Sequence, residues 1–226
     1  MKSLLLYALI SCATVAHAQR PQAAPRPDSV RVALHFGSDN AELHQLMARA
    51  LHVEKWHIEA INPQLAGRRF HLTYQEYRHG VAAPEQKLAG DAQRLLTFDP
   101  QGRFSFDVFA RQATENRLEN QFLFTGGSTL KTFEAQPGKG NLYSLRPDIW
   151  PYRPRQSAVA LGPAQQPTTE RSFAVGQKVP FLVYTLPYEE DGWLLYCKLA
   201  QSKTPVQDWY KTFKIPHFVV YNLVVE

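Results

Sequence analysis

The sequence predicts a mainly β protein: an antiparallel sandwich or partly open barrel, with an N-terminal helix and a short helix near residues 204–213. Three observations lead to this fold class. Short runs of β-branched and aromatic residues recur through the chain and are bounded by turn residues. Two of the connections carry the proline and glycine signals of tight turns. The last third of the chain is the most apolar part, as expected for the covered middle of a sheet.

Residues 1–18 have the pattern of a secretory signal peptide. Lys2 precedes an apolar run, and small residues lead to Ala16 and Ala18 before Gln19. We expect cleavage between Ala18 and Gln19. Because the apolar run is shorter than the ~20 residues of a membrane-spanning helix, we predict no transmembrane segment in the mature chain. The mature protein is then exported, to a periplasmic or extracellular location.

A second processing pattern overlaps the first. Leu9, Ile10 and Ser11 precede Cys12 as they would at a lipoprotein processing site, where Cys12 would become the lipidated first residue and anchor the protein. Small and apolar residues continue beyond Cys12, which favours ordinary cleavage. In that case Cys197 is the one cysteine of the mature chain, and no intramolecular disulfide can form.

The composition predicts a single folded domain after the signal peptide. Residues 19–29 are rich in proline and are interpreted as a spacer, and residues 30–226 as a single β-rich domain with a possible internal break around 146–167. The chain is 44% hydrophobic and 12% aromatic, which is enough for a sizeable core. Its formal net charge of +5, or +4 without Lys2, gives no ground for a nucleic-acid partner.

The N-terminal helix is predicted over residues 39–52. Asp39 and Glu42 have the spacing of a capping box. Apolar residues follow at helical spacing: Leu43, Leu46, Met47, Ala50 and Leu51. We expect this stripe to pack on a sheet.

The predicted strands are short and separated by turn residues. They cover residues 55–61, 69–77, 95–98, 103–109, 121–125, 130–135, 142–145, 179–188, 193–200 and 217–225. Pro100 and Gly102 predict a tight turn, after which Phe104, Phe106 and Val108 alternate toward a core. Asp191-Gly192 predicts a hairpin. The three C-terminal strands, apolar on both faces, are expected in the middle of a sheet.

The second helix and the longest loop lie in the C-terminal half. Thr204 and Gln207 resemble a capping box, with Pro205 at the first helical position. One apolar stripe should cover the sheet: Val206, Trp209, Tyr210 and Phe213. Residues 146–167 are predicted to form a long loop between an N-terminal β region and the C-terminal hairpin.

That loop contains the candidate ligand-binding residues. It carries two flat aromatic rings, Trp150 and Tyr152, beside the guanidinium groups of Arg153 and Arg155. Aromatic rings stack on sugars, and guanidinium groups pair with anions. The alternative is that the rings pack down and seal the end of the sheet.

Histidines suggest a weaker site. If residues 55–61 and 69–77 pair as a hairpin, His57 lies opposite His71, with Glu59 opposite Arg69. Two such histidines could begin a zinc or copper site, but no third ligand is evident. We therefore predict no metal and no other cofactor.

The sequence contains none of the common catalytic motifs, such as His-Glu-x-x-His, Gly-x-Ser-x-Gly or a phosphate loop. We therefore expect a non-enzymatic interaction or structural module of a bacterial cell envelope, whose partner is a polysaccharide or an envelope protein. The alternative is an extracytoplasmic hydrolase that acts on a polymer such as polysaccharide or peptide. Two carboxyl groups facing each other in an aromatic cleft would favour this alternative.

Overall fold

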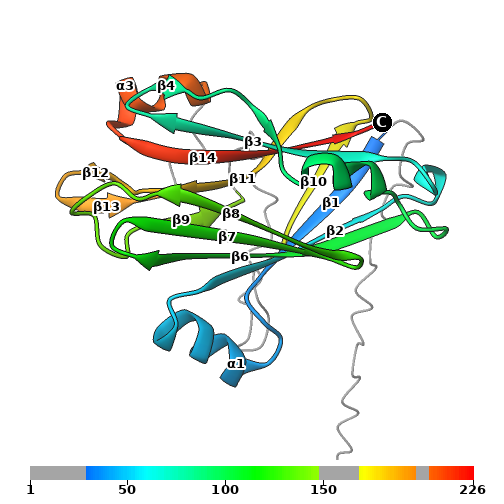
Figure 1. Ribbon diagram of the computed structural model, residues 1–226, viewed down its shortest axis with the longest axis horizontal. Helices are drawn as coiled ribbons and strands as arrows, with labels where there is room; N and C mark the ends of the chain where they lie inside the picture. The colour runs from blue at the N-terminus through cyan, green and yellow to red at the C-terminus, as the bar shows by residue number, and fades with distance from the viewer. Residues whose placement is uncertain (1–28, 148–167, 197–203) are drawn as a thin grey trace, which may run out of the picture.

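The computed structural model describes residues 29–147, 168–196 and 204–226, which form two antiparallel sheets packed face to face (Figure 1). The first sheet has the strand order β10-β1-β2-β6-β7-β8. The second has the order β4-β3-β14-β11-β9, and β5 also pairs with β3. Strands β12 and β13 form a separate hairpin. The predicted mainly β fold class is confirmed, and in the described residues neither sheet closes into a barrel.

The strands of the first sheet are β1 (Ser29–Phe36), β2 (Glu54–Ile61), β6 (Arg103–Thr114), β7 (Arg117–Phe124), β8 (Gly127–Glu134) and β10 (Thr168–Ala174). Those of the second are β3 (Phe70–Arg78), β4 (Val81–Ala82), β5 (Gln86–Lys87), β9 (Ser144–Arg146), β11 (Val179–Thr185) and β14 (His217–Val225). The hairpin is formed by β12 (Tyr188–Glu190) and β13 (Trp193–Leu195). Strands that precede residue 148 pair with strands that follow residue 167 in both sheets, as β1 does with β10 and β3 with β14.

Strand β6 shows how the sequence pattern forms one wall of the core. Phe104, Phe106 and Val108 are buried, while Arg103 before them and Ser105 between the first two are exposed. Successive side chains of a strand point to opposite faces, so this alternation places the aromatic rings between the sheets. The predicted alternation is therefore confirmed, and the strand continues to Thr114.

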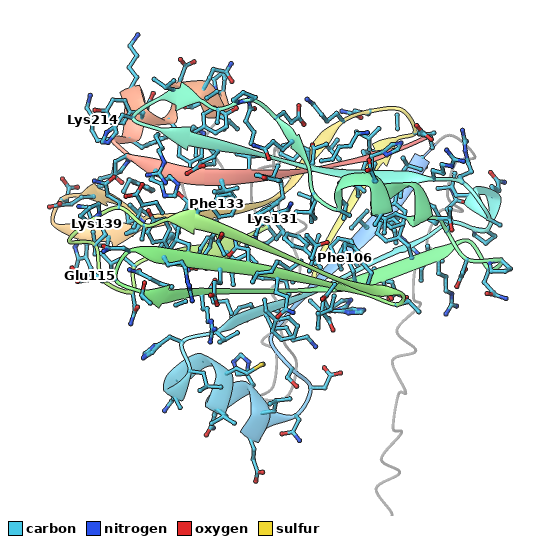
Figure 2. The ribbon with its side chains drawn as sticks, viewed as in Figure 1. Phe106, Glu115, Lys131, Phe133, Lys139 and Lys214 are labelled. Carbon is cyan, nitrogen blue, oxygen red and sulfur yellow. The ribbon has the colours of Figure 1, made fainter. Side chains whose placement is uncertain are left out.

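Aromatic rings join the two sheets across the core. Phe122 of β7 lies 5.0 Å from Tyr221 of β14, measured between ring centroids. Phe106 and Phe133, both in the layer between the sheets (Figure 2), come from the first sheet. The Phe133 ring meets Tyr74 of β3 edge-on at 5.6 Å. Edge-on and offset arrangements of this kind add to the stabilisation from burial alone.

The strands that were predicted to lie in the middle of a sheet differ in burial. Strand β14 lies between β3 and β11, and eight of its nine residues are buried, as predicted. The prediction is wrong for residues 193–195, because β13 is paired only with β12 and exposes 72% of Trp193 and 52% of Leu194. An apolar run does not by itself distinguish a central strand from the exposed strand of a hairpin.

Both predicted turns form. Gly102 N donates to the Asp99 carbonyl at 2.9 Å, and Gly102 has a φ of +68°. At the tip of the β12–β13 hairpin, Asp191 and Gly192 both have positive φ, as the predicted type of Asp-Gly turn requires.

The N-terminal helix is present but does not pack as predicted. It consists of α1 (Ala41–Gln45) and a wider turn of π-helix, η1 (Leu46–Ala50), and lies away from both sheets (Figure 1). Asn40, rather than Asp39, caps it by accepting a hydrogen bond from Leu43 N at 3.0 Å. The predicted stripe is largely exposed: Leu43, Leu46 and Leu51 expose 46%, 51% and 55% of their surface. Met47 is the buried member of the stripe.

The second predicted helix covers the second sheet. It begins with a short 3₁₀ turn, η4 (Val206–Asp208), and continues as α3 (Trp209–Phe213). Trp209 is buried and its ring centroid lies 5.2 Å from that of Phe218 in β14. No side chain caps η4, so the predicted capping box does not form.

Two further expectations are corrected, and two strands were not expected. Strands β2 and β3 do not form a hairpin, because the η2 turn (Pro63–Leu65) carries the chain from the first sheet to the second. Residues 95–98 are not a strand: they follow the 3₁₀ helix η3 (Gly90–Leu95) and make one isolated bridge, between Thr97 and Arg69. Strands β1 and β10 are missing from the sequence-based prediction. In β1, the buried Val30, Val32 and Leu34 alternate with Arg31, Ala33 and His35, which is the pattern of a half-buried strand, whereas β10 is mostly polar.

Candidate functional site

The predicted ligand-binding residues Trp150, Tyr152, Arg153 and Arg155 lie outside the described residues, as do the signal peptide with Ala16, Ala18 and Gln19, and Cys12 and Cys197. The described residues instead form two pockets of similar size. We call them the aromatic pocket and the hairpin pocket.

The aromatic pocket has a volume of about 560 Å³ and lies where β6 extends beyond its partner β7. Its apolar lining is formed by Phe70, Leu96, Phe104 and Phe124. Its rim carries small hydroxyl side chains: Thr97, Ser105, Thr125, Ser128 and Thr129. A concave, largely apolar surface with a few polar groups around it is typical of a ligand pocket.

Backbone pairing positions both sides of this pocket. The register of β6 with β7 ends at Phe106 opposite Phe124, so residues 103–105 of β6 face the turn between β7 and β8. On the other side, Phe70 N donates to the Leu96 carbonyl at 3.0 Å, and Phe98 N donates to the Arg68 carbonyl at 2.9 Å. These bonds hold the segment after η3 against β3.

Phe70 and Phe104 form the floor of the aromatic pocket, and Phe98, which does not line the pocket, packs against both rings. Phe70 stacks on Phe104 at 4.1 Å between centroids, and Phe98 meets Phe104 edge-on at 4.8 Å. These three rings are 2–5% exposed, whereas Phe124 at the turn is half-buried. We infer that the floor is preformed and that Phe124 offers the most accessible ring face.

Two carboxylates line the aromatic pocket, but one of them is used by the fold. Asp99 Oδ1 accepts hydrogen bonds from Gln101 N at 2.9 Å and from Arg103 N at 2.8 Å. This carboxylate therefore holds the tight turn that precedes β6. Glu59 of β2 is the second.

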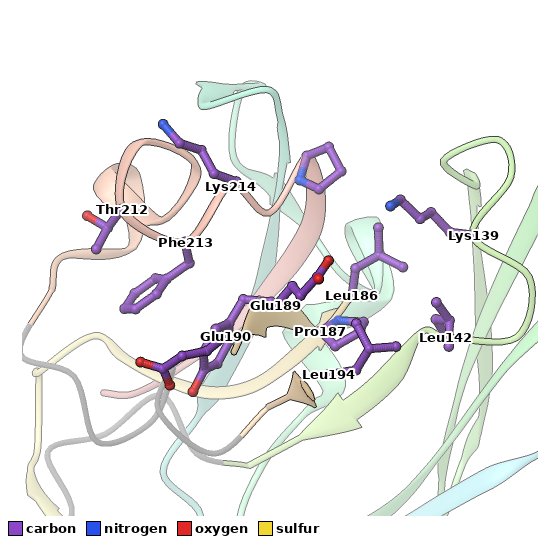
Figure 3. Close-up of a pocket in the computed structure, with 12 residues that line it drawn as sticks. Lys139, Leu142, Leu186, Pro187, Glu189, Glu190, Leu194, Thr212, Phe213 and Lys214 are labelled. Carbon is purple, nitrogen blue, oxygen red and sulfur yellow. The ribbon is translucent and has the colours of Figure 1, made fainter. Parts of the chain in front are cut away.

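The hairpin pocket has a volume of about 590 Å³ and lies between the β12–β13 hairpin, the end of α3 and the loop before β9 (Figure 3). Its apolar lining includes Leu142, Leu186, Leu194 and Phe213. Charged side chains from different elements also line it: Lys139, Glu189, Glu190 and Lys214. Figure 3 shows Lys139 and Glu189 directed into the same space, and Glu190 directed away from Glu189.

Close to the hairpin pocket lies a buried polar network. The Tyr143 hydroxyl donates to His217 Nδ1 at 2.6 Å, and His217 Nε2 donates to Glu76 Oε1 at 2.9 Å. Glu76 also accepts from Arg78 at 2.8 Å. This chain of contacts resembles the order of a nucleophile, a base and an orienting acid.

The electrostatics of the network indicate a structural role. His217 is fully buried, and burial lowers its pKa. Burial also raises the pKa of Tyr143 to about 12, so its hydroxyl remains protonated and is a poor nucleophile. The hydrogen bond from His217 is the largest cause that lowers the pKa of Glu76. The network therefore satisfies buried polar groups between β3, β14 and the loop before β9.

A second buried carboxyl, Glu54 of β2, connects the two sheets. Burial raises the pKa of Glu54. Its carboxylate accepts a hydrogen bond from the Ser144 hydroxyl at 2.6 Å and another from the Leu145 backbone N–H. Beside it, Trp56 Nε1 donates to the Leu145 carbonyl at 3.0 Å. These bonds join the short strand β9 to the first sheet.

The histidine pair suggested by the sequence is wrong. His57 of β2 lies beside Asp107 of β6, with Nδ1 2.9 Å from Oδ1, and opposite His35 of β1. His71 lies in the other sheet and pairs with Glu226 at 2.6 Å. Across the described ranges, no group of three histidine, cysteine or acidic side chains is arranged to hold a metal ion.

Sequence reasoning identified one part of the pockets and missed the rest. The alternation that predicts buried Phe104 is the one signal for the aromatic floor, because Phe70 and Phe124 come from other strands. The Thr125-Gly126-Gly127-Ser128 segment is a recognisable turn signal in the sequence. The hairpin pocket combines residues from segments 139–142, 186–194 and 212–216, and no local pattern connects them.

Comparisons of the chain with known protein families, with curated proteins and with solved structures find no match. Within the described ranges, no helix has both the length and the apolar character needed to cross a membrane. The chemistry of the pockets is therefore the basis for proposing a function.

Proposed function

We propose that the protein is an exported, non-enzymatic interaction module of the cell envelope that binds a sugar unit of a polysaccharide in the aromatic pocket. Export is supported by the pattern of residues 1–18, with Ala16, Ala18 and Gln19 at the expected cleavage site. The observation that carries the binding proposal is the combination of an aromatic floor with five hydroxyl side chains, beside the charged side chains of Glu59, Asp99 and Arg103.

Sugar chemistry suits this combination. One face of a pyranose ring carries C–H groups that pack on an aromatic ring, while its hydroxyl groups seek hydrogen-bond partners around the edge. Phe124 would supply the accessible ring, and Ser105, Ser128 and Thr129 would supply hydroxyl groups that both donate and accept. The pocket volume of about 560 Å³ falls within the usual range for small-molecule sites.

A non-catalytic role is supported by how the acids are used. Glycoside hydrolysis needs two carboxyl groups that face each other across the scissile bond. Of the two carboxylates that line the aromatic pocket, Asp99 is engaged by backbone N–H groups of its own turn, which leaves Glu59 as the second. In the hairpin pocket, Glu189 and Glu190 are directed away from each other (Figure 3).

Co-sedimentation with insoluble polymers tests the proposal. The mature chain from Gln19 is incubated with peptidoglycan sacculi, cellulose and chitin, and the bound fraction is compared between wild type and Phe124→Ala. We expect binding to at least one polymer and about three- to tenfold weaker binding by the variant, as expected for the loss of one aromatic contact. Leu130→Ala is the matched control, because Leu130 is 53% exposed on β8 and does not line the pocket.

Other outcomes have clear meanings. Absence of binding to all three polymers, or equal binding by wild type and Phe124→Ala, contradicts the proposal. Release of soluble sugar during the incubation supports the hydrolase alternative instead. The intact mass of the protein purified from its native host tests export: an N-terminus at Gln19 supports free diffusion outside the cytoplasm, whereas a lipidated Cys12 supports a membrane anchor.

A further inference from the structure

The hairpin pocket contains two opposite charges that face each other without pairing. Lys139 comes from the loop before β9 and Glu189 from β12, and Figure 3 shows their charged ends directed into the same space from opposite sides. Both side chains are exposed, and no ion pair within 4.0 Å joins either of them to another described residue. Each charge is therefore available to a ligand.

The space between these charges is lined by apolar groups. Leu142, Leu186 and Leu194 lie near the two charged side chains, and Phe213 of α3 lines the other side of the pocket. Leu194 exposes 52% of its surface. A ligand with an apolar body would cover this surface.

The other two charged side chains of the pocket do not face this space. Figure 3 shows the ammonium group of Lys214 directed outward beside Thr212, and Glu190 directed away from Lys139. The charge pattern inside the pocket is thus one cation and one anion on opposite sides. Complementarity calls for a ligand with a carboxylate near Lys139 and an ammonium group near Glu189.

We propose that the hairpin pocket is a second binding site, which takes a zwitterionic group with an apolar body: a short peptide that carries a free ammonium group and a free carboxylate. The ligand carboxylate pairs with Lys139, its ammonium group pairs with Glu189, and its apolar side chains cover Leu142 and Leu194. Such a group can come from a free amino acid or from a peptide, and the two sources share this chemistry. The site does not depend on sugar binding in the aromatic pocket.

The walls of the hairpin pocket are short elements. The pocket is bounded by a hairpin of two three-residue strands and a five-residue helix, which are joined where Tyr188 and Phe213 meet at 5.3 Å between ring centroids. Two-stranded hairpins are only marginally stable by themselves. We therefore expect the hairpin to adjust its position when a ligand bridges the two charges.

Titration calorimetry with the mature protein and the dipeptide Leu-Leu tests the proposal. Lys139→Gln and Glu189→Gln should each weaken binding about two- to fivefold, as expected for the loss of one exposed ion pair. Lys214→Gln and Glu190→Gln are the matched controls, since they remove the same charges from side chains that line the pocket but face away. They should leave the affinity unchanged.

Modified dipeptides assign each charge. N-acetyl-Leu-Leu lacks the ammonium group, so its affinity should not fall further in Glu189→Gln, and Leu-Leu amide should be equally insensitive to Lys139→Gln. Free leucine separates the two sources: weaker binding of leucine than of Leu-Leu supports a peptide ligand, and tighter binding of leucine overturns that assignment.

Absence of Leu-Leu binding, or equal weakening by the control variants, overturns the site itself. Phe124→Ala should bind Leu-Leu normally, so this result and the polysaccharide result are independent.

Discussion

The two pockets differ in what holds their walls. The aromatic pocket is bounded by strand ends of both main sheets, by the segment around η3 and by a ring cluster that is almost fully buried. The hairpin pocket is bounded by short elements outside the two main sheets and carries charges on opposite sides. The buried rings of the aromatic pocket suit selection of a ligand by shape, whereas the exposed opposite charges of the hairpin pocket suit recognition that depends on ionic strength. One sandwich thus carries two sites of different chemistry, one bounded by buried rings and the other by opposite charges.

The largest expected effect is at Phe104, which belongs to the aromatic floor. Phe104→Ala removes a 5% exposed ring that contacts Phe70 and Phe98, so the free energy of unfolding should fall by about 3–5 kcal/mol. Urea unfolding measures this loss. Leu130→Ala, at an exposed position, should change stability by less than about 0.5 kcal/mol. A similar loss in both variants would mean that the ring cluster does not stabilise the aromatic pocket.

An intermediate effect is expected at Gly102, in the turn that leads into β6. A Cβ atom there would lie 2.2 Å from the Asn62 carbonyl oxygen, and the φ of +68° already favours glycine. Gly102→Ala should therefore lower the free energy of unfolding by about 1–3 kcal/mol. Gly138→Ala is the control, because Gly138 has a φ of +71° but a Cβ atom there would meet nothing within 4 Å beyond its chain neighbours. If the two variants lose equal stability, backbone strain alone explains the effect and the close approach to Asn62 does not contribute.

A smaller effect is expected from pH, through the polar network close to the hairpin pocket. Burial holds the pKa of His217 below its usual value of 6.5, so the unfolded chain binds a proton more readily than the folded chain. The contribution of His217 to the free energy of unfolding is fully present above pH 6.5. It decreases as the pH falls toward the pKa of His217 in the folded protein. The lowered pKa of Glu76 continues the fall at more acidic pH, and the Arg78, Glu134 and Tyr143 groups also face this network.

The pH effect can be assigned to His217 by mutation. Urea unfolding at pH 7.5 and 5.5 should show a loss of stability on acidification in wild type. His217→Gln should be less stable at pH 7.5 but less sensitive to acidification. The control is His52→Asn, at an exposed position with a φ of 50° that asparagine tolerates, and it should keep the wild-type sensitivity. An unchanged pH dependence in His217→Gln would assign the effect to other groups.

The sequence-based predictions are correct where a local pattern directly indicates which side chains are buried. The alternation of Phe104, Phe106 and Val108 and the apolar run of β14 both place side chains correctly. They are wrong where two different arrangements of the same strands would bury the same side chains. Residues 55–61 and 69–77 look like a hairpin, yet their strands belong to different sheets because η2 crosses between them.

The prediction that the apolar stripe of the N-terminal helix packs on a sheet is wrong for the same reason. Leu43, Leu46 and Leu51 have helical spacing, and this spacing predicts a face but does not show what covers it. In the structure the connection between β1 and β2 carries the helix away from both sheets, as Figure 1 shows. The position of a connection depends on long-range packing, which a local pattern does not contain.

The sequence by itself determined the mainly β class, most of the strands, the two tight turns and the short helix at 204–213, because each depends on residues close together in the chain. Tertiary structure alone decided which strands share a sheet and which side chains line each pocket. Phe70, Phe104 and Phe124 line one pocket because three strands end near one another, and Lys139 and Glu189 face each other because a hairpin folds beside a distant loop. Pairings of this kind depend on contacts between distant parts of the chain, so they become visible only in the folded protein.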